Sequence, residues 1–133
     1  HKQRIQLDEE LIKAFDLDKM LHKRMRTLSG GTRQKVSASL AFLFNPAVLI
    51  LDEPTAGLDP LSSEILKEKI TKEKDQGKLV LITSHILSEL DDMVSQVIYM
   101  QDGKCCFHKS IEDIRLETKQ EKLAKAIASL IAK

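Results

Sequence analysis

Glycine is scarce in this sequence, and its glycines do not form a phosphate-binding loop. Only five occur among 133 residues: Gly30, Gly31, Gly57, Gly77 and Gly103. A loop that wraps the phosphates of a nucleotide has the pattern G-x-x-x-x-G-K-[ST]. Lysine follows the last two glycines, but no Ser or Thr comes next and no glycine stands five positions earlier. We therefore expect this chain, by itself, to bind nucleotide poorly.

Aromatic residues and an excess of positive charge are also missing. The chain has no Trp and one Tyr, and its 21 basic and 20 acidic residues leave a net charge of +1. Single-stranded nucleic acid needs aromatic side chains for stacking, and duplexes need a basic field. One basic cluster exists, which we interpret as a solvated surface: Lys19, His22, Lys23, Arg24 and Arg26. We expect no nucleic-acid partner.

Cysteines and long apolar runs are equally sparse. Cys105 and Cys106 are adjacent and are the only cysteines, so an ordinary loop-closing disulfide is excluded and a reducing compartment is indicated. No apolar run approaches the roughly 18 residues of a membrane span, and the first residues do not resemble a signal peptide. We expect a soluble, cytoplasmic protein.

The first third of the chain has apolar residues at helical spacing. We predict a helix over residues 8–17, with Asp8 as its cap, and a short second segment around Met20 to Met25. A third helix should begin after Gly30-Gly31 and end near Phe44, because Asn45-Pro46 leaves the helical region. Its apolar residues are four: Val36, Leu40, Leu43 and Phe44.

The middle of the chain predicts a strand, a helix and a second strand. Residues 47–51 and 79–82 are continuous apolar runs, typical of strands buried on both faces of a parallel sheet. Asp59-Pro60 starts the intervening helix, with Asp as cap and Pro at the first position. This order implies a right-handed parallel crossover.

The last third predicts a helix, a hairpin and a helical end. We expect a short helix over residues 86–94 and two strands, 97–100 and 104–108, joined at Asp102-Gly103. Ser110 then heads a final segment, whose best amphipathic stretch has four apolar residues at helical spacing: Leu123, Ile127, Leu130 and Ile131.

Ser29-Gly30-Gly31 opens a predicted helix and is therefore a candidate anion site. Free N–H groups and the positive end of the helix dipole attract anions there, and glycine lets a phosphate approach the backbone closely. The alternative is an ordinary turn with a helix cap. These few residues alone favour that alternative.

Asp52, Glu53 and His85 follow the two predicted strands. Ligands of parallel sheets bind outside the carboxyl ends of the strands, so an acid there can hold Mg²⁺ while its neighbour activates water. An imidazole at the same edge can donate to a phosphate. The alternatives are a solvated acidic loop and a structural histidine, and for Asp59 the role of helix cap.

Together these motifs resemble those of the ATP-binding cassette (ABC) family. Leu-Ser-Gly-Gly-Thr at 28–32 resembles the family signature, and residues 48–53 resemble its Walker B strand. Gly-Leu-Asp at 57–59 resembles its D-loop, and His85 its switch histidine. The resemblance covers roughly residues 8–108. Thr32 stands in place of the commonest glutamine, and Leu40 in place of a frequent arginine.

The resemblance implies an α/β fold: part of a P-loop NTPase (RecA-like) core with parallel strands, part of an α-helical subdomain, and a C-terminal hairpin and helix. Residues 1–45 would belong to the helical signature subdomain, 46–109 to the second half of the ATP-binding core, and 110–133 to a C-terminal helical segment. Family members carry the Walker A loop and the Q-loop upstream of this region. We therefore expect a C-terminal portion that is inactive alone.

The resemblance also implies roles for the site residues. Asp52 would hold Mg²⁺ through water, Glu53 would be the general base, and His85 would contact the γ-phosphate. Across a head-to-tail dimer of nucleotide-binding domains, the Ser29-Gly30-Gly31 turn would bind the γ-phosphate of the opposite subunit's ATP. Asp59 would communicate between the subunits.

The function implied is the ATP-binding and hydrolysing subunit of an ABC transporter, driving a separate membrane permease from the inner face of the cell membrane. The alternative is a soluble relative, an ABC-F-type ribosome factor or a DNA-repair ATPase. The segment before Leu28 lacks sustained heptads, which is evidence against the coiled coils of the repair proteins. We also expect self-association through an exposed sheet edge.

Overall fold

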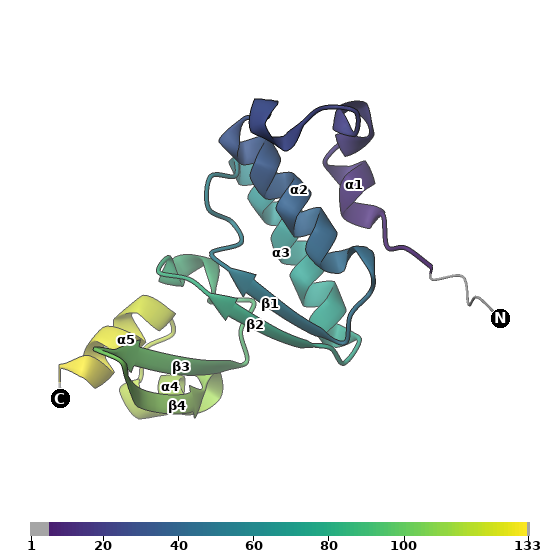
Figure 1. Cartoon of the computed structure of the whole chain (residues 1–133). Helices are drawn as coiled ribbons and strands as arrows, with labels where there is room; N and C mark the ends of the chain where they lie inside the picture. Colours follow the sequence, from purple (N-terminus) through teal and green to yellow (C-terminus); the bar gives the residue numbers. More distant parts are fainter. Residues whose placement is uncertain (1–5, 133) are drawn as a thin grey trace. The chain divides into compact units, whose positions relative to one another are not determined.

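The computed structural model describes residues 6–132, which fall into two compact units divided between Thr83 and Ser84. The first unit combines helices with a parallel pair of strands (Figure 1). Its elements follow in chain order: α1 (Glu10–Ala14), η1 (Leu17–Met20), η2 (Met25–Thr27), α2 (Gly30–Leu43), β1 (Val48–Asp52), α3 (Pro60–Asp75) and β2 (Leu79–Thr83). The predicted α/β class, with a strand, a helix and a parallel strand in that order, is confirmed.

The core of the first unit lies between the helices and one face of the strand pair. Its most buried side chains come from α1, α2, β1 and α3: Leu11, Phe42, Leu49, Leu66 and Ile70, each 2% exposed or less. Each such side chain contributes about 1.5 to 3 kcal/mol when it leaves water. The helices are therefore held to the sheet mainly by apolar burial.

The prediction that both strands are buried on two faces is wrong. Leu49 and Leu51 of β1 are 2% and 6% exposed, but Ile50 between them is 71% exposed. Ile50 pairs with Leu81 of β2, which is also exposed. Successive strand residues point to opposite faces, and among residues 6–132 the helices α2 and α3 cover only one of them. A continuous apolar run thus lies here in a sheet with one open face.

The helix predicted over residues 8–17 needs correction, whereas the predicted bounds of the next helix are confirmed by α2, Gly30–Leu43. The helix predicted over 8–17 is shorter, because the chain turns left-handed at Asp16 (φ 55°). Asp8 does not cap it as N-cap residue, but its Oδ1 accepts the N–H of Glu10 at 3.1 Å. In α2, the apolar residues Leu40 and Phe44 are 55% and 62% exposed. The helix packs instead through a different set: Ala38, Ser39 and Phe42.

The start of α3 forms as predicted. Asp59 is its N-cap, and the carboxylate Oδ2 accepts the N–H of Ser62 at 3.1 Å. Pro60 is the first helical residue, and Gly77 follows the helix in a left-handed conformation (φ 91°) that glycine adopts without strain.

The second unit is a hairpin with helices. Its elements are η3 (Leu87–Glu89), β3 (Gln96–Gln101), β4 (Lys104–Ser110), α4 (Ile111–Thr118) and α5 (Leu123–Ile131). The strands are antiparallel, and Asp102 and Gly103 both have positive φ (52° and 74°), as the predicted two-residue turn requires. An apolar cluster holds this unit together: Ile111, Leu123 and Ile127, with Leu87, Leu90, Val94, Val97, Tyr99 and Phe107 against it.

The helix predicted over 86–94 is wrong, since only η3 forms there. The segment closes short turns, with Glu89 N–H bonded to the carbonyl of Ile86 and Met93 N–H to that of Leu90. Asp91 has a long-range partner: its Oδ1 accepts the N–H of Leu123 at 2.6 Å, at the start of α5. The final segment is confirmed, with Ser110 capping α4 through a 3.1 Å bond from the N–H of Asp113.

The two compact units of the structure do not coincide with the three subdomains predicted from the sequence. The compact units meet between Thr83 and Ser84. The division into residues 1–45, 46–109 and 110–133 concerns subdomains of a whole ATP-binding cassette, and it stays a prediction.

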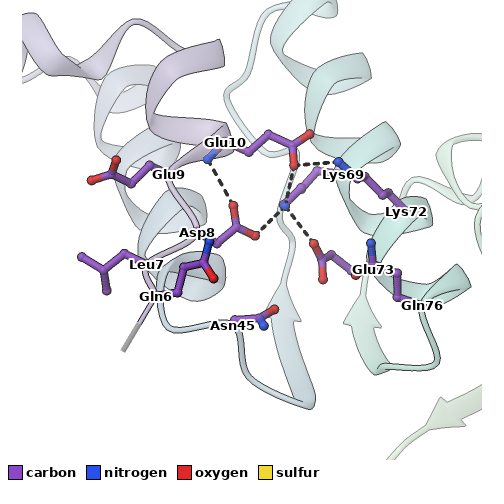
Figure 2. Close-up of a pocket in the computed structure, with 10 residues that line it drawn as sticks. All are labelled: Gln6, Leu7, Asp8, Glu9, Glu10, Asn45, Lys69, Lys72, Glu73 and Gln76. Atoms are coloured by element: carbon purple, nitrogen blue, oxygen red, sulfur yellow. Dashed lines mark hydrogen bonds and ion pairs between the residues drawn. The ribbon is translucent and has the colours of Figure 1, made fainter. Parts of the chain in front are cut away.

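An open polar pocket of about 360 Å³ lies where the start of α1 faces α3 (Figure 2). Acidic, basic and amide side chains make up nearly all of its lining: Gln6, Leu7, Asp8, Glu9, Glu10, Asn45, Lys69, Lys72, Glu73 and Gln76. The charges within it are largely paired with one another, as the dashed lines of Figure 2 show.

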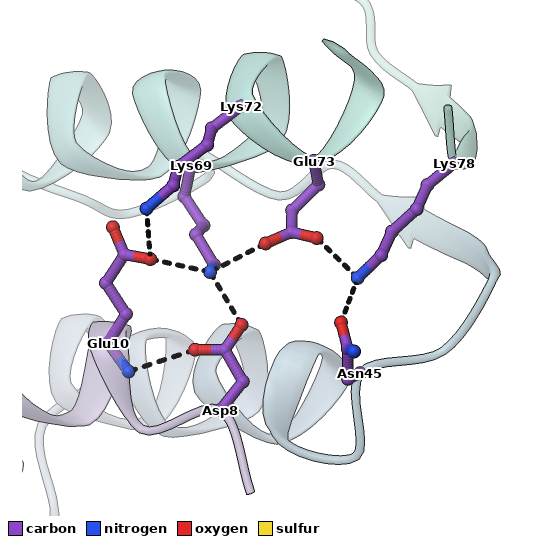
Figure 3. Close-up of polar contacts among 7 residues, drawn as sticks. All are labelled: Asp8, Glu10, Asn45, Lys69, Lys72, Glu73 and Lys78. Carbon is purple, nitrogen blue, oxygen red and sulfur yellow. Dashed lines mark hydrogen bonds and ion pairs between the residues drawn. The ribbon is translucent and has the colours of Figure 1, made fainter. Parts of the chain in front are cut away.

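Lys69 is the centre of this ion cluster (Figure 3). It is 3% exposed, and its Nζ lies 2.7 Å from Asp8, 2.8 Å from Glu10 and 2.8 Å from Glu73. Glu73, also 3% exposed, contacts Lys78 as well. Three carboxylates from two parts of the chain thus share one buried ammonium, which fastens the start of α1 to α3.

The protonation of the cluster follows from these contacts. Burial acts to lower the pKa of Lys69, but hydrogen bonds to the carboxylates of Asp8, Glu10 and Glu73 outweigh it and raise the pKa. Burial acts to raise the pKa of Asp8 and Glu73, but the bond to Lys69 holds both below their ordinary values of 3.8 and 4.5. All four groups are therefore charged at neutral pH.

Replacing Lys69 by Met should lower the free energy of unfolding by about 3 kcal/mol, because the buried carboxylate of Glu73 and the partly buried one of Asp8 lose their shared cation. Urea unfolding of the chain measures this. Lys67→Met is the matched control on the same helix, since Lys67 pairs with the exposed Glu64 at 3.1 Å and such pairs contribute about 1 kcal/mol or less. Equal losses for the two variants would contradict a structural role of the cluster.

The same cluster should make the chain sensitive to acid. Because the pKa of Asp8 and of Glu73 is lower in the folded state than in the unfolded state, the unfolded chain binds more protons as pH falls below their ordinary values of 3.8 and 4.5. The stabilisation is complete above that range and is lost as pH falls through the lowered values. Unfolding measured across this range should show a steeper loss for the wild type than for Lys69→Met, and parallel curves would refute the assignment.

Candidate functional site

The start of α2 forms as an exposed, capped helix terminus. Ser29 is the N-cap, and its Oγ accepts the N–H of Thr32 at 3.1 Å and lies 2.8 Å from the Thr32 hydroxyl oxygen. Ser29 and Gly30 are exposed, and a Cβ built on Gly30 would meet nothing within 4 Å. The cap that was the alternative interpretation is therefore present. Anion binding at this terminus is compatible with it and stays a prediction.

Gly31 serves a different purpose from its neighbour. A Cβ at this position would lie 3.1 Å from the carbonyl oxygen of Gly57, closer than side chains normally approach. Gly57 itself has φ 75°. The first turn of α2 therefore packs directly against the backbone of the loop that follows β1.

The two acids lie where β1 ends. Asp52 pairs with Thr83, the last residue of β2, and the Thr83 hydroxyl donates to Asp52 Oδ1. The N–H of Glu53 donates to the Thr83 carbonyl at 2.9 Å, and its distance to the Thr83 hydroxyl oxygen is 3.3 Å. Glu53 is left-handed (φ 47°), so the chain leaves the strand abruptly between the two acids.

Two polar residues near these acids were missed by the sequence analysis. Neither Thr83 nor Gln34 was among the candidate residues predicted from the sequence. The register Asp52 to Thr83 gives the first its contact with Asp52. Gln34 lies one turn into α2, and its Nε2 donates to the carbonyl of Pro54 at 2.7 Å. The available signal for Thr83 was its matched position at the end of the second apolar run.

Asp59 has the structural role that was the competing explanation. Besides capping α3, its Oδ1 accepts the Ser62 hydroxyl at 2.6 Å and lies 3.6 Å from Lys35 Nζ. The hydrogen bonds from Ser62 lower the pKa of Asp59, and Lys35 adds to the effect. Communication across a dimer through Asp59 stays a prediction.

The ends of β1 and β2 lie at the same edge of the sheet, as the predicted site requires. Asp52 is opposite Thr83 at that edge. His85 follows two residues later, in the second unit, so its contact with a nucleotide stays a prediction. None of the predicted site residues lines the polar pocket of Figure 2.

The oxygen atoms at this edge suit a hard divalent cation. Carboxylate and hydroxyl oxygens are ligands that Mg²⁺ accepts, and it keeps several waters and phosphate oxygens around it. Among residues 6–132, no three His, Cys, Asp or Glu side chains gather into a metal-binding group. A Mg²⁺ ion held mostly by water and phosphate would need only one carboxylate from the chain, and that role of Asp52 stays a prediction.

The family model described as ABC transporter matches residues 2–56. ABC transporter ATP-binding protein NatA of Bacillus subtilis (strain 168) is 33% identical over 115 residues, covering 86% of this chain and 47% of the relative. The chain thus spans about half the length of that curated relative.

In residues 6–132, no helix is both long and apolar enough to cross a membrane.

Solved structures agree with this. One described as the ATP binding subunit of an ABC transporter superposes with a TM-score of 0.84 at 29% identity, covering 95% of this chain and 53% of that one. The RNase-L inhibitor superposes with a TM-score of 0.67 at 30% identity, covering 79% and 21%. With the signature-like helix start and the Asp-Glu strand end both in place, the chain belongs to the ABC transporter family of ATP-binding proteins.

Proposed function

We propose that this chain is part of the ATP-binding and hydrolysing subunit of an ABC transporter, which drives substrate transport by a separate membrane permease. One observation carries the proposal. The parallel register places Asp52 beside Thr83 at the carboxyl end of the sheet. The first turn of α2 packs against the loop that follows β1. The three groups that we propose as metal-binding acid, base and anion-binding helix start thus belong to one continuous piece of structure, which supports the proposal.

The residues at and after the ends of β1 and β2 would act on the nucleotide bound by the same subunit. Asp52 would hold Mg²⁺ through water, and the ion, when bound, would neutralise charge on the phosphates. Glu53 would accept a proton from the attacking water, which general bases accelerate by about 10² to 10⁴. His85 would donate a hydrogen bond to the γ-phosphate.

The start of α2 would act on the nucleotide of a second subunit. In a head-to-tail dimer, the Ser29 hydroxyl and the N–H groups of Gly30 and Gly31 would surround the γ-phosphate held opposite. Preorganised donors of this kind contribute about 10² to 10³ each. Asp59, which is fixed by Ser62 and Lys35, would transmit the state of one site to the other. Hydrolysis would then wait for both subunits to close.

The proposal also covers where the subunit works and how this chain would behave alone. The subunit would work in the cytoplasm, peripherally at the inner face of the cell membrane, where it docks on the permease. By itself this chain would be inactive. It would also self-associate, because the open apolar face of β1 and β2 adjoins exposed strand edges.

Glu53→Gln in the complete protein should abolish ATP turnover while ATP stays bound and the dimer stays closed. The amide keeps the shape of the side chain but cannot accept the proton of water. Phosphate release and nucleotide retention, measured on the same sample, test both parts. Glu64→Gln is the matched control, because Glu64 is an exposed residue of α3, and it should turn over normally. Normal turnover in Glu53→Gln would rule Glu53 out as the base.

Fractionation of cells separates the transporter from a soluble alternative. That alternative is an ABC-F-type ribosome factor or a DNA-repair ATPase. The superposition on the RNase-L inhibitor supports it, but with a lower TM-score than the transporter subunit. We expect the complete protein to sediment with membranes and to be released by detergent together with a permease. Migration with ribosomes instead, in sucrose gradients free of membrane, would reject the transporter assignment.

A further inference from the structure

We propose that Gln34 is a positioning residue for Glu53: it ties the start of α2 to the backbone on which the base is carried. The proposal rests on the role of Glu53 given above and goes beyond it, because it names the residue through which the signature helix acts on the base.

The contact is made by the Gln34 side-chain amide. Its Nε2 lies 2.7 Å from the carbonyl oxygen of Pro54 and 3.4 Å from that of Glu53. The opposite orientation of the amide would place its oxygen against two carbonyl oxygens, where no proton is available for a bond. The donor assignment therefore follows from the chemistry of the two acceptors.

Glu53 needs such support because its backbone is strained. Its φ of 47° is left-handed, a conformation that costs a residue with a Cβ about 1 to 2 kcal/mol. On its amino side the N–H is bonded to the Thr83 carbonyl at 2.9 Å, in β2. On its carboxyl side the carbonyl accepts from Ala56 N–H at 3.1 Å and faces Gln34. The base is thus held between β2 and α2.

Other contacts make α2 and this loop move together. Gly31 lies against the Gly57 carbonyl, and Lys35 reaches Asp59 at 3.6 Å. These contacts join the helix start to the far end of the loop, and only Gln34 among these α2 residues bonds the part next to Glu53. A displacement of α2 by an anion at its start would therefore be passed to Glu53 through the Gln34 amide.

The first test is Gln34→Leu in the complete protein, because leucine keeps much of the volume but has no donor. We expect kcat for ATP hydrolysis to fall about 10- to 100-fold, as a misplaced base allows, with KM for ATP changed less than about twofold. Gln76→Leu is the control, because it is the same substitution at the C-cap of α3. The backbone N–H of Gln76, which the substitution keeps, makes the bonds to the helix, so kcat should not change. A kcat for Gln34→Leu within twofold of the wild type would overturn the proposal.

The second test uses Gln34→Glu and needs only one variant protein. An ionised carboxylate cannot donate to either carbonyl, whereas the protonated acid can donate its one O–H to one of them. The ratio of its kcat to that of the wild type should therefore rise at least about threefold as pH falls from about 8 to about 5.5, toward the pKa of a glutamate beside carbonyl oxygens. A purely structural loss would leave the ratio constant, and a constant ratio refutes the proposal even where Gln34→Leu does not fold.

Glu53→Gln, assayed beside these variants, separates the two hypotheses. If Glu53→Gln turns over ATP normally, the role of Glu53 fails and Gln34 has no base to position. If Glu53→Gln is inactive while Gln34→Leu keeps wild-type kcat, the proposed function stands and only the role of Gln34 fails.

Discussion

The parallel register of β1 and β2 is the constraint on which the candidate site depends. Side chains alternate between the faces of a strand, so a shift of one residue would move Leu49 and Leu51 from the helix-covered face to the open one. Burial of these two leucines therefore selects the register, and that register sets Asp52 opposite Thr83. A hydrophobic requirement in the interior thus decides which polar groups meet at the edge.

The Lys69 cluster is a second constraint, of a different physical kind. Desolvating four charged groups costs free energy, which three short contacts to one ammonium offset. Apolar residues of similar size could hold α1 and α3 together equally well. What the charges add is a unique position for α1. Asp8 and Glu10 both contact the buried Lys69, so the short α1 helix has a single favourable place along α3. This matters because α1 has only five residues and a small apolar face of its own.

Features that depend on neighbouring residues could be predicted from the sequence, and features that depend on distant residues could not. The Asp59 cap and the Asp102-Gly103 turn are local, and both form as expected. The exposure of Ile50 depends on which helices cover the sheet. In the segment 86–94, short turns form in place of a helix, and Asp91 bonds the distant Leu123, a contact that the local sequence does not reveal.

The same division holds in the candidate site. Asp52 and Glu53 were predicted from the strand that precedes them, since the end of a buried parallel strand is a local signal. Thr83 and Gln34 act on those acids from 31 and 19 residues away, through pairings that only the folded chain makes. Sequence reasoning therefore found the reacting groups of the proposal and missed the residues that hold them.

The two adjacent glycines show how structure refines a motif. At Gly31 a Cβ would meet the Gly57 carbonyl at 3.1 Å, so packing within the chain is enough to favour glycine there. At Gly30 a Cβ would meet nothing within 4 Å of the described residues, and its backbone is ordinary helix. Alanine is the better helix former, so folding of this chain gives no reason for glycine at that position. The anion binding proposed for this exposed helix start would supply such a reason, because a phosphate held by a second subunit could approach the backbone closely where no Cβ stands.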